Sequence, residues 1–429
     1  MNKSTLISLT LLSALSASAQ RTTQNLRQWQ FSRDSISYKA VTIPHDWAIN
    51  GPFDKKWDLQ NVAIVQNGET EKTEKSGRSG ALPWIGRGYY KTTVDIKRVP
   101  KTAVLEFDGA MADPHVYING KLAGHWAYGY NAFRVDAAPY LKKGKNEISV
   151  SLNNREESSR WYPGGGLYRP VQIVTTADRA SINPWGSYFR TELIKEGKAE
   201  VSVCTNINNA EKCLVVENLL IDNEGKTVAQ TKTASDVEQR LTVENAQLWS
   251  PESPYLYRFV TRLYRNNKLV DETSQKVGIR TVRVAQYDGF QLNGKSRKIK
   301  GVCLHHDLGP LGAAVNKAAL IRQIRTMKDM GCDAIRTAHN MPSTWQMEVC
   351  DSMGMMVMAE SFDMWIYPKC KNGYALNFKE WADRDIENLV RNHRNHPSIV
   401  MWSIGNEIPE QWSEEGRQIS EHLQALCQK

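Results

Sequence analysis

The chain has 429 residues, of which 41% are hydrophobic and 24% charged, and its Lys and Arg residues outnumber Asp and Glu by 55 to 46. This composition excludes a collagen, a coiled coil, a polytopic membrane protein and a wholly disordered chain. The net charge of +9 is spread singly among acidic residues without a long basic run, so nucleic acid is not an expected partner. At about 150 residues per domain, the length predicts roughly three domains.

The first 19 residues have the pattern of an export signal. Lys3 supplies a positive start, Leu6 to Leu15 form a short apolar stretch, and Ala17-Ser18-Ala19 is a small-residue cleavage site. We expect cleavage after Ala19 and export to the periplasm or beyond. The apolar stretch is too short to cross a bilayer, and no other run reaches about 18 apolar residues, so no membrane span is expected.

The seven cysteines form no CxxC pair and have no spacing to histidines that is typical of zinc sites. The cysteine and histidine spacings therefore indicate no zinc site. The sequence also contains no motif that indicates a nucleotide or flavin cofactor.

Residues 20–178 are predicted to form a β-sandwich of the jelly-roll type, because short alternating strands are separated by Gly, Pro and Asn turns. Asn119-Gly120, directly after Val116-Tyr117-Ile118, is a strong hairpin signal. Residues 179–284 continue the alternation, for example at Leu214-Val215-Val216. A second sandwich of about 100 residues, similar to an immunoglobulin domain, fits this segment.

Residues 285–429 change to strands that alternate with helical patterns. Strands are predicted at 299–304, 334–336, 355–358 and 399–404, and helices at 316–330, 344–353, 378–393 and 413–426. Four such units fit either a small doubly wound sheet or the first half of a (β/α)₈ barrel. We favour the half barrel, because polar residues follow every strand, which is where barrel enzymes carry their catalytic groups.

The sharpest motif is the run Ile399 to Ile404, which is followed by Gly405, Asn406 and Glu407. Glu407 is predicted to face the mouth of the barrel. A glycosidic oxygen is a poor leaving group, and a carboxylic acid at this place can protonate it. Asn406 can bind the sugar 2-hydroxyl. The alternative is a surface glutamate that caps the next helix.

Six more residues are candidates for substrate binding, and each has a structural alternative. The polar residues that follow the first strand can instead cap a helix or bind a metal. An arginine inside a strand can form a structural ion pair below the site, and a tryptophan can pack in the core. These residues are His305, Asp307, Arg336, His339, Asn340 and Trp365.

Taken in order, the motifs of the chain resemble glycoside hydrolase family 2, particularly its exported, β-galactosidase-like bacterial members. The resemblance covers almost all of the chain after residue 19. It is carried by Gly88-Tyr89-Tyr90-Lys91, the segment 159–171 (SRWYPGGGLYRPV), Leu248-Trp249-Ser250-Pro251-Glu252, Gly278-Ile279-Arg280-Thr281, Lys300-Gly301-Val302, His305-His306-Asp307, Arg336-Thr337-Ala338-His339-Asn340 and the segment 395–407.

The resemblance implies a sugar-binding jelly roll, an immunoglobulin-like sandwich and a TIM barrel, and a retaining, two-step hydrolysis of a terminal β-linked sugar. Glu407 matches the family's acid/base, and Asn406 its substrate-binding neighbour. His339 and His305 match histidines at the sugar, and Arg336 matches the strand arginine below the catalytic pair. A β-galactoside is the leading substrate, and β-glucuronidase or β-mannosidase activity is the alternative within the family.

Two positions depart from the family pattern. Glu360 follows Ala359 where members often carry Asp-Glu, and Arg160 stands where some β-galactosidases bring an Asp to the sugar. No residue matches the family's nucleophile, so we expect a catalytic domain that is truncated and incomplete as given. The competing hypotheses are a non-catalytic carbohydrate-binding remnant and an adhesion protein built on two β-sandwiches.

Overall fold

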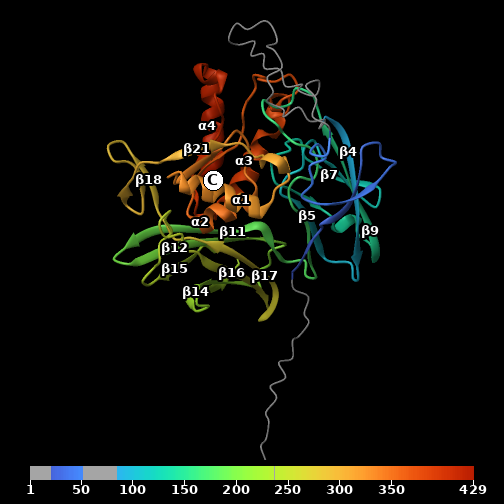
Figure 1. The fold of residues 1–429 in the computed structure, drawn as a ribbon. Coiled ribbons are helices and arrows are strands. Elements are labelled where there is room, and N and C mark those ends of the chain that lie inside the picture. Colours follow the sequence, from blue (N-terminus) through green and yellow to red (C-terminus); the bar gives the residue numbers. More distant parts are fainter. Residues whose placement is uncertain (1–20, 52–84, 236) are drawn as a thin grey trace, which may run out of the picture.

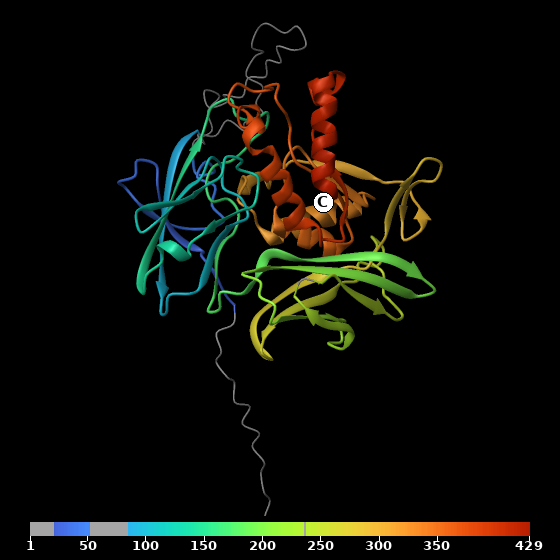
Figure 2. The same cartoon turned by 180° about the vertical axis from the view of Figure 1, so that it is seen from behind.

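The computed structural model describes residues 21–51, 85–235 and 237–429, so the predicted export signal lies outside the described residues. Two β-sandwiches are followed along the chain by a region of parallel strands and helices (Figure 1). Figures 1 and 2 show this last region, in orange and red, lying against the first sandwich in blue and cyan and the second in green. The predicted order of two sandwiches and a TIM-barrel-type region is confirmed.

The first sandwich consists of a four-stranded sheet, β1-β10-β5-β8, and a six-stranded sheet, β3-β2-β4-β9-β6-β7. Alternation of buried and exposed residues along β5 and β9 places apolar side chains between the sheets. Phe107 and Phe133 stack there at 4.6 Å between ring centroids. The elements are β1 Thr22–Asn25, β2 Gln28–Ser32, β3 Lys39–Thr42, β4 Gly86–Ile96, β5 Thr102–Phe107, β6 His115–Ile118, β7 Lys121–His125, β8 Phe133–Asp136, η3 Ala138–Tyr140, β9 Gly144–Asn154 and β10 Val171–Thr176.

The second sandwich pairs the sheet β11-β12-β15 with the sheet β14-β13-β16-β17. Its core, between the two sheets, includes Val201, Leu220 and Phe259. A small sheet of β18 to β20 follows. The elements are β11 Ser181–Lys195, β12 Lys198–Asn208, β13 Leu214–Ile221, β14 Thr227–Ala234, β15 Gln239–Val243, β16 Tyr257–Arg265, β17 Lys268–Val277, β18 Val282–Ala285, β19 Gly289–Leu292 and β20 Lys295–Ser296.

The barrel-type region contains a parallel sheet in the order β21-β22-β23-β24, with helices between successive strands. The central strands β22 and β23 are largely buried, whereas residues of the edge strand β21 are exposed. The elements are β21 Gly301–Leu304, η4 Gly309–Leu311, α1 Lys317–Asp329, β22 Ala334–Thr337, α2 Thr344–Met353, β23 Met356–Glu360, η5 Tyr374–Leu376, α3 Phe378–His393, β24 Ile399–Ser403, η6 Pro409–Trp412 and α4 Glu414–Gln428.

Three helices of this region begin at a capping side chain, and two of them are followed by a glycine in the left-handed conformation. The side chains of Asn316, Ser343 and Ser413 cap the first turns of α1, α2 and α4 by accepting backbone N–H groups. Gly331 and Gly354 follow α1 and α2 with positive φ angles of 87° and 69°. Local sequence chemistry therefore determines these boundaries.

Buried polar contacts join the second sandwich to the barrel-type region. The guanidinium of Arg280 donates to the carbonyl oxygens of Pro397 and Ile399, at 3.0 and 2.7 Å, just before and at the start of β24. The fully buried Trp249 donates its indole N–H to the carbonyl of Asp351 at 2.8 Å. These contacts fix the second sandwich beneath the parallel sheet.

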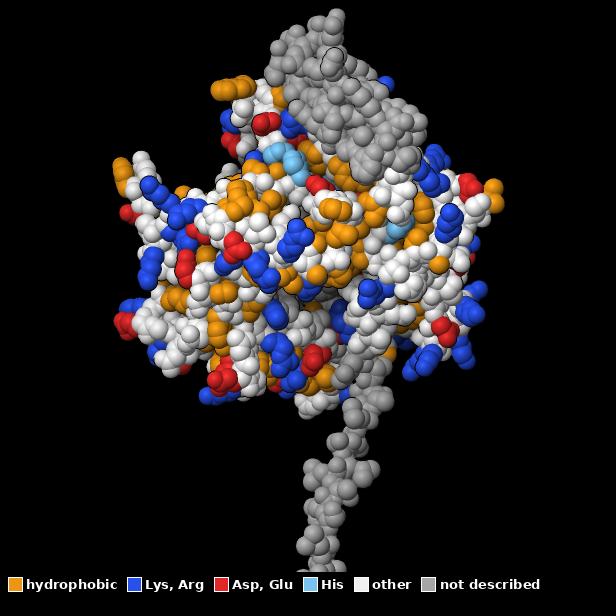
Figure 3. Space-filling model, in the orientation of Figure 1, with side chains coloured by type: hydrophobic (Ala, Val, Ile, Leu, Met, Phe, Trp, Pro, Cys, Tyr) orange, Lys and Arg blue, Asp and Glu red, His pale blue; other side chains and the backbone are white. Residues whose placement is uncertain are grey.

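Figure 3 shows Lys and Arg side chains scattered over one face of the molecule with Asp and Glu among them, rather than gathered into one basic band. None of the helices in the described ranges is long and apolar enough to cross a membrane.

Candidate active site

The polar residues singled out after the four parallel strands meet at one edge of the sheet. His305 follows β21, His339 follows β22, Glu360 ends β23 and Asn406 follows β24. Because the strands are parallel and adjacent, their carboxyl ends lie side by side. The predicted site residues therefore lie at the end of the sheet that carries catalytic groups in barrel enzymes.

Glu360 lies at the centre of this edge and is fully buried. Arg336 donates from Nε to Glu360 Oε2 at 2.7 Å, and Ser403 Oγ donates to the same oxygen at 2.6 Å. The other oxygen, Oε1, lies 2.7 Å from Nδ1 of His339. A buried carboxylate needs such partners, and here they come from the ends of the two neighbouring strands β22 and β24. Glu360 thus orients Arg336 and His339.

Asn406 continues the network on the other side of Arg336. Its Oδ1 accepts from Arg336 at 2.8 Å, its Nδ2 donates to Asp363 Oδ1 at 2.9 Å, and its backbone oxygen accepts from Lys369 Nζ at 2.7 Å. The side chain is 2% exposed. With both ends of the amide engaged, its orientation is determined.

Glu407, by contrast, projects from the edge of the sheet, and its side chain is 73% exposed. Its φ angle is 43°, in the left-handed region that non-glycine residues seldom occupy. Its carboxylate oxygen Oε2 lies 3.5 Å from the guanidinium of Arg160 and 4.0 Å from Nζ of Lys369. Strained backbone of this kind gathers at functional sites, where surrounding contacts maintain it.

Asp363 binds both cations that face Glu407. Arg160 donates to its two oxygens at 2.8 and 2.5 Å, and Lys369 Nζ lies 3.3 Å from Oδ1. Burial acts to raise the pKa of Asp363, but the hydrogen bonds and charge of Arg160 outweigh burial and keep this pKa below its ordinary value. Burial lowers the pKa of Lys369. The positive charges of Arg160 and Lys369 thus lie beside the carboxylates of Asp363 and Glu407.

Arg160 enters the site from the first sandwich, and its partner Asp363 lies 203 residues further along the chain. The sequence singled out position 160 as a departure from the family pattern and gave Asp363 no role. Lys369 was missed, because it lies in an irregular segment after β23 with no recurring pattern around it. Only its burial, with 1% of the side chain exposed, distinguishes it from a surface lysine.

His305 lies beside His339, with ring centroids 5.5 Å apart, and its ring also packs 5.1 Å from Trp161 of the first sandwich. Burial and the neighbouring His339 lower the pKa of His305, which favours the neutral imidazole. Both predicted histidines therefore lie together at the edge of the sheet. Trp161 forms a wall beside them.

Asp307, Asn340 and Trp365 have mainly structural contacts. Asp307 accepts the backbone N–H of Gly309 at 3.3 Å, and the buried Asn340 donates to the carbonyl of Ala338 at 3.4 Å. Trp365 is 3% exposed and donates its indole N–H to the carbonyl of Ile404 at 2.8 Å. The burial of Trp365 favours packing in the core over stacking on a sugar, which stays a prediction.

The first sandwich also binds the loops that follow the first two parallel strands. Asp46, fully buried, accepts the backbone N–H of Ala313 at 2.9 Å. Arg169, 1% exposed, donates to the carbonyl oxygens of Met341 and Pro342 at 2.8 and 3.2 Å. The loops around the site are thereby fixed from outside the sheet.

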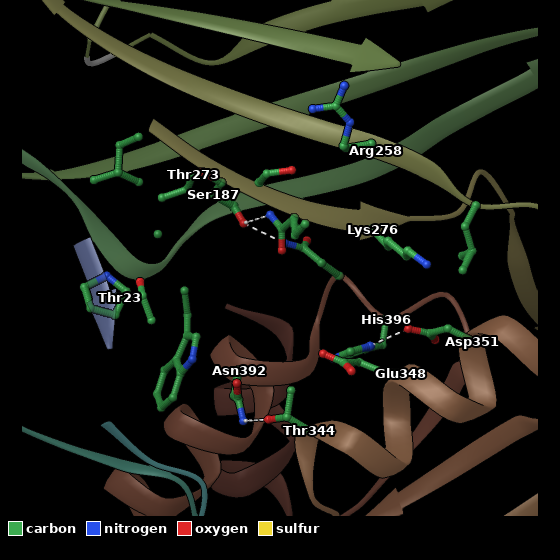
Figure 4. Close-up of a pocket in the computed structure, with 18 of the residues that line it drawn as sticks. Thr23, Ser187, Arg258, Thr273, Lys276, Thr344, Glu348, Asp351, Asn392 and His396 are labelled. Carbon is green, nitrogen blue, oxygen red and sulfur yellow. Dashed lines mark hydrogen bonds and ion pairs between the residues drawn. The ribbon is translucent and has the colours of Figure 1, made fainter. Parts of the chain in front are cut away.

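A separate cavity lies away from these residues. Its volume is about 820 Å³, and Thr344, Glu348, Asp351, Asn392 and His396 line one side of it. Figure 4 shows these side chains opposite residues of the second sandwich. The residues that line this cavity do not include Glu360, Arg336, Asn406 or Glu407, so it is separate from the candidate site.

The fold and the site together are those of a barrel-type hydrolase region that follows two β-sandwiches. A family model described as glycosyl hydrolases family 2 matches residues 185–280, and one described as glycosyl hydrolases family 2, TIM barrel domain, matches residues 282–428. The chain belongs to glycosyl hydrolase family 2.

Three relatives illustrate the similarity. The β-galactosidase BoGH2A of Bacteroides ovatus is 40% identical over 88% of this chain and 44% of its own length. A β-glucuronidase of Bacteroides fragilis is 30% identical over 72% of this chain and 48% of its own. The crystal structure of a family 2 member from Bacteroides cellulosilyticus has a TM-score of 0.85 and 32% identity, and the match covers 95% of this chain and 54% of that one. The chain spans about half the length of these relatives.

Proposed function

We propose that this protein is a retaining glycoside hydrolase that cleaves terminal β-linked sugars, with Glu407 as the general acid/base. The observation that supports the role is the placement of Glu407. It is the exposed carboxylate at the carboxyl edge of the sheet, on a backbone that Asn406 and Lys369 fix. In the first step the carboxylic acid gives its proton to the glycosidic oxygen, and in the second the carboxylate takes a proton from water.

Arg160 and Lys369 support the second half of this cycle. Once Glu407 has given up its proton, its negative charge lies 3.5 and 4.0 Å from these two cations. Asp363 pairs with both cations as well and so holds them beside Glu407.

A β-galactoside is the proposed substrate, supported by the similarity to BoGH2A. A β-glucuronide is the second candidate, supported by the relative from Bacteroides fragilis. Side-by-side assays with the aryl β-D-galactoside and the aryl β-D-glucuronide separate the two.

The nucleophile is not assigned to any residue that the structure describes. Glu360 is fully buried, and both of its oxygens are bound by Arg336, Ser403 and His339. Glu410 is 2% exposed and accepts two backbone N–H groups through one oxygen. The alternative function, carbohydrate binding without hydrolysis, therefore enters the test.

The experiment compares the protein with its Glu407→Gln variant on galactosides with good and poor leaving groups. We expect the variant to lose about 10²-fold or more in kcat on an alkyl galactoside, and less on a dinitrophenyl galactoside, whose leaving group needs no proton. Glu415→Gln, an exposed carboxylate on α4, is the matched control. Equal losses on both substrates would contradict the acid role, and binding of a galactose-type iminosugar without turnover would support the non-catalytic alternative.

The finer assignments belong to the same proposal. They are an export signal at residues 1–19, a sugar-binding jelly roll at 20–178, an immunoglobulin-like sandwich at 179–284 and the first half of a TIM barrel at 285–429. Limited proteolysis tests the boundaries, and amino-terminal sequencing of the exported protein tests cleavage after Ala19.

A further inference from the structure

A second cluster of polar residues lies on the first sandwich, away from the carboxyl edge of the parallel sheet. His115 on β6 and His125 on β7 are direct partners in the antiparallel pairing of these strands. Their rings stack at 4.2 Å between centroids, and Asp113 precedes β6. One potential ligand atom from each of the three residues lies within 4.8 Å of the other two. Neither the family resemblance nor the proposed hydrolysis uses these residues.

The hydrogen bonds of the cluster leave nitrogen lone pairs where a metal ion needs them. His115 Nδ1 lies 3.2 Å from the backbone oxygen of Asp113, which can only accept. In the tautomer that donates from Nδ1 to this oxygen, Nε2 keeps a lone pair for a metal ion. A histidine that binds a metal usually donates its other ring N–H in this way. His125 Nε2 lies 2.7 Å from Asp113 Oδ1, and a metal ion can take the place of the shared proton.

The alternative is an ordinary histidine–aspartate pair. The chain contains one for comparison, because His422 on α4 lies 2.9 Å from Asp383 in an exposed pair. That pair is not among the groups of three or more metal-ligating residues found in the described ranges. In the first sandwich, Asp113 and the second imidazole of His115 complete a set of two nitrogens and one oxygen around one point.

We propose that Asp113, His115 and His125 bind a divalent transition-metal ion, with Zn²⁺ as the chemically favoured ion. Two imidazoles and one carboxylate are a common zinc ligand set, and water takes the fourth position. Asp113 and His115 line a cavity of about 520 Å³, which provides the path for the ion and space for the water. The side chains of Asp113 and His125 are each 33% exposed, so the ligands are within reach of solvent.

The position of the site indicates a structural role. His125 packs edge-on against Trp381 of α3, with ring centroids 5.2 Å apart. Fixing His125 to Asp113 and His115 therefore fixes the β6–β7 hairpin where it contacts the barrel-type region. This differs from a catalytic metal, because the ligands lie outside the network of Glu360, Arg336 and Asn406.

The test uses the full chain after treatment with a chelator, titrated with Co²⁺ as a spectroscopic substitute for Zn²⁺. We expect one Co²⁺ per chain, visible absorption of a four- or five-coordinate ion, displacement by Zn²⁺ and no displacement by Mg²⁺. Asp113→Asn should weaken binding at least about tenfold. Asparagine is suited to this position because the φ angle of residue 113 is 53°.

His125→Ala is the second test variant and His422→Ala the matched control. All three variants retain the seven cysteines, so a signal from thiolates would be the same in each. Circular dichroism confirms that each variant is folded. Absence of bound Co²⁺ in the folded unaltered chain, or binding that is equal in Asp113→Asn, His125→Ala and His422→Ala, would overturn the proposal. Because no readout uses hydrolysis, the result is independent of the proposed glycosidase activity.

Discussion

Replacing Arg160 by alanine tests whether the ion pair with Asp363 joins the first sandwich to the candidate active site. The two side chains are 14% and 5% exposed and share two hydrogen bonds of 2.8 and 2.5 Å. Removing one partner of a buried pair costs about 3–5 kcal/mol, because the other charge remains buried. Since Lys369 and Asn406 still contact Asp363, we expect the lower end, about 3 kcal/mol.

The assay is urea unfolding at pH 7, followed by tryptophan fluorescence. Arg417→Ala is the matched control, because Arg417 makes an equally short pair with Glu414 that is exposed on α4. Exposed pairs contribute little, so this variant should unfold almost as the unaltered chain does. Equal unfolding midpoints for Arg160→Ala and Arg417→Ala would refute the reasoning from burial.

The pH dependence gives the same prediction a second readout. Since the pKa of Asp363 is below its ordinary value of 3.8 in the folded chain, the pair stabilises the ionised carboxylate. This contribution is present above pH 3.8 and is lost as the pH falls through the lowered pKa. The difference in stability between the unaltered chain and Arg160→Ala should therefore shrink on acidification, and a difference that grows would contradict the assignment.

Two more predictions concern contacts between the barrel-type region and the two sandwiches. Burial raises the pKa of Asp385 on α3 to about 7 from 3.8, so the folded chain retains a proton that the unfolded chain releases. The free energy of unfolding should therefore decrease by at most about 4 kcal/mol as the pH rises from 4 to 7. In thermal unfolding, Asp385→Asn should show a weaker dependence of stability on pH over this range, and an unchanged dependence would contradict the assignment. Gly354→Ala should destabilise by more than about 1 kcal/mol, because φ is +69° and the added Cβ would lie 2.5 Å from the oxygen of Pro251. Gly289→Ala, with φ +65° and open space, is the control, and equal losses of stability would show that the contact is unimportant.

The helices of the barrel-type region show how much local sequence can predict. The predicted ranges 344–353 and 378–393 are those of α2 and α3. In α2 a capping serine and a terminal glycine lie within a few residues of the apolar positions, and in α3 the spacing of buried apolar residues extends along the whole helix. The parallel strand order alone places four of the candidate site residues at one edge of the sheet, namely Glu407, Asn406, His339 and Arg336.

The sequence by itself therefore determined the two sandwiches, the strand–helix alternation and the polar strand ends, because each depends on short-range periodicity. Only the tertiary structure decided that Arg160 and Lys369 both bind Asp363 beside Glu407, that Trp365 is buried and that Asp113 meets two histidines across a strand pair. These outcomes depend on packing between segments as far as 203 residues apart. Local sequence patterns do not depend on such contacts. The spacing of apolar and polar residues around a position is the same whichever distant residue contacts it.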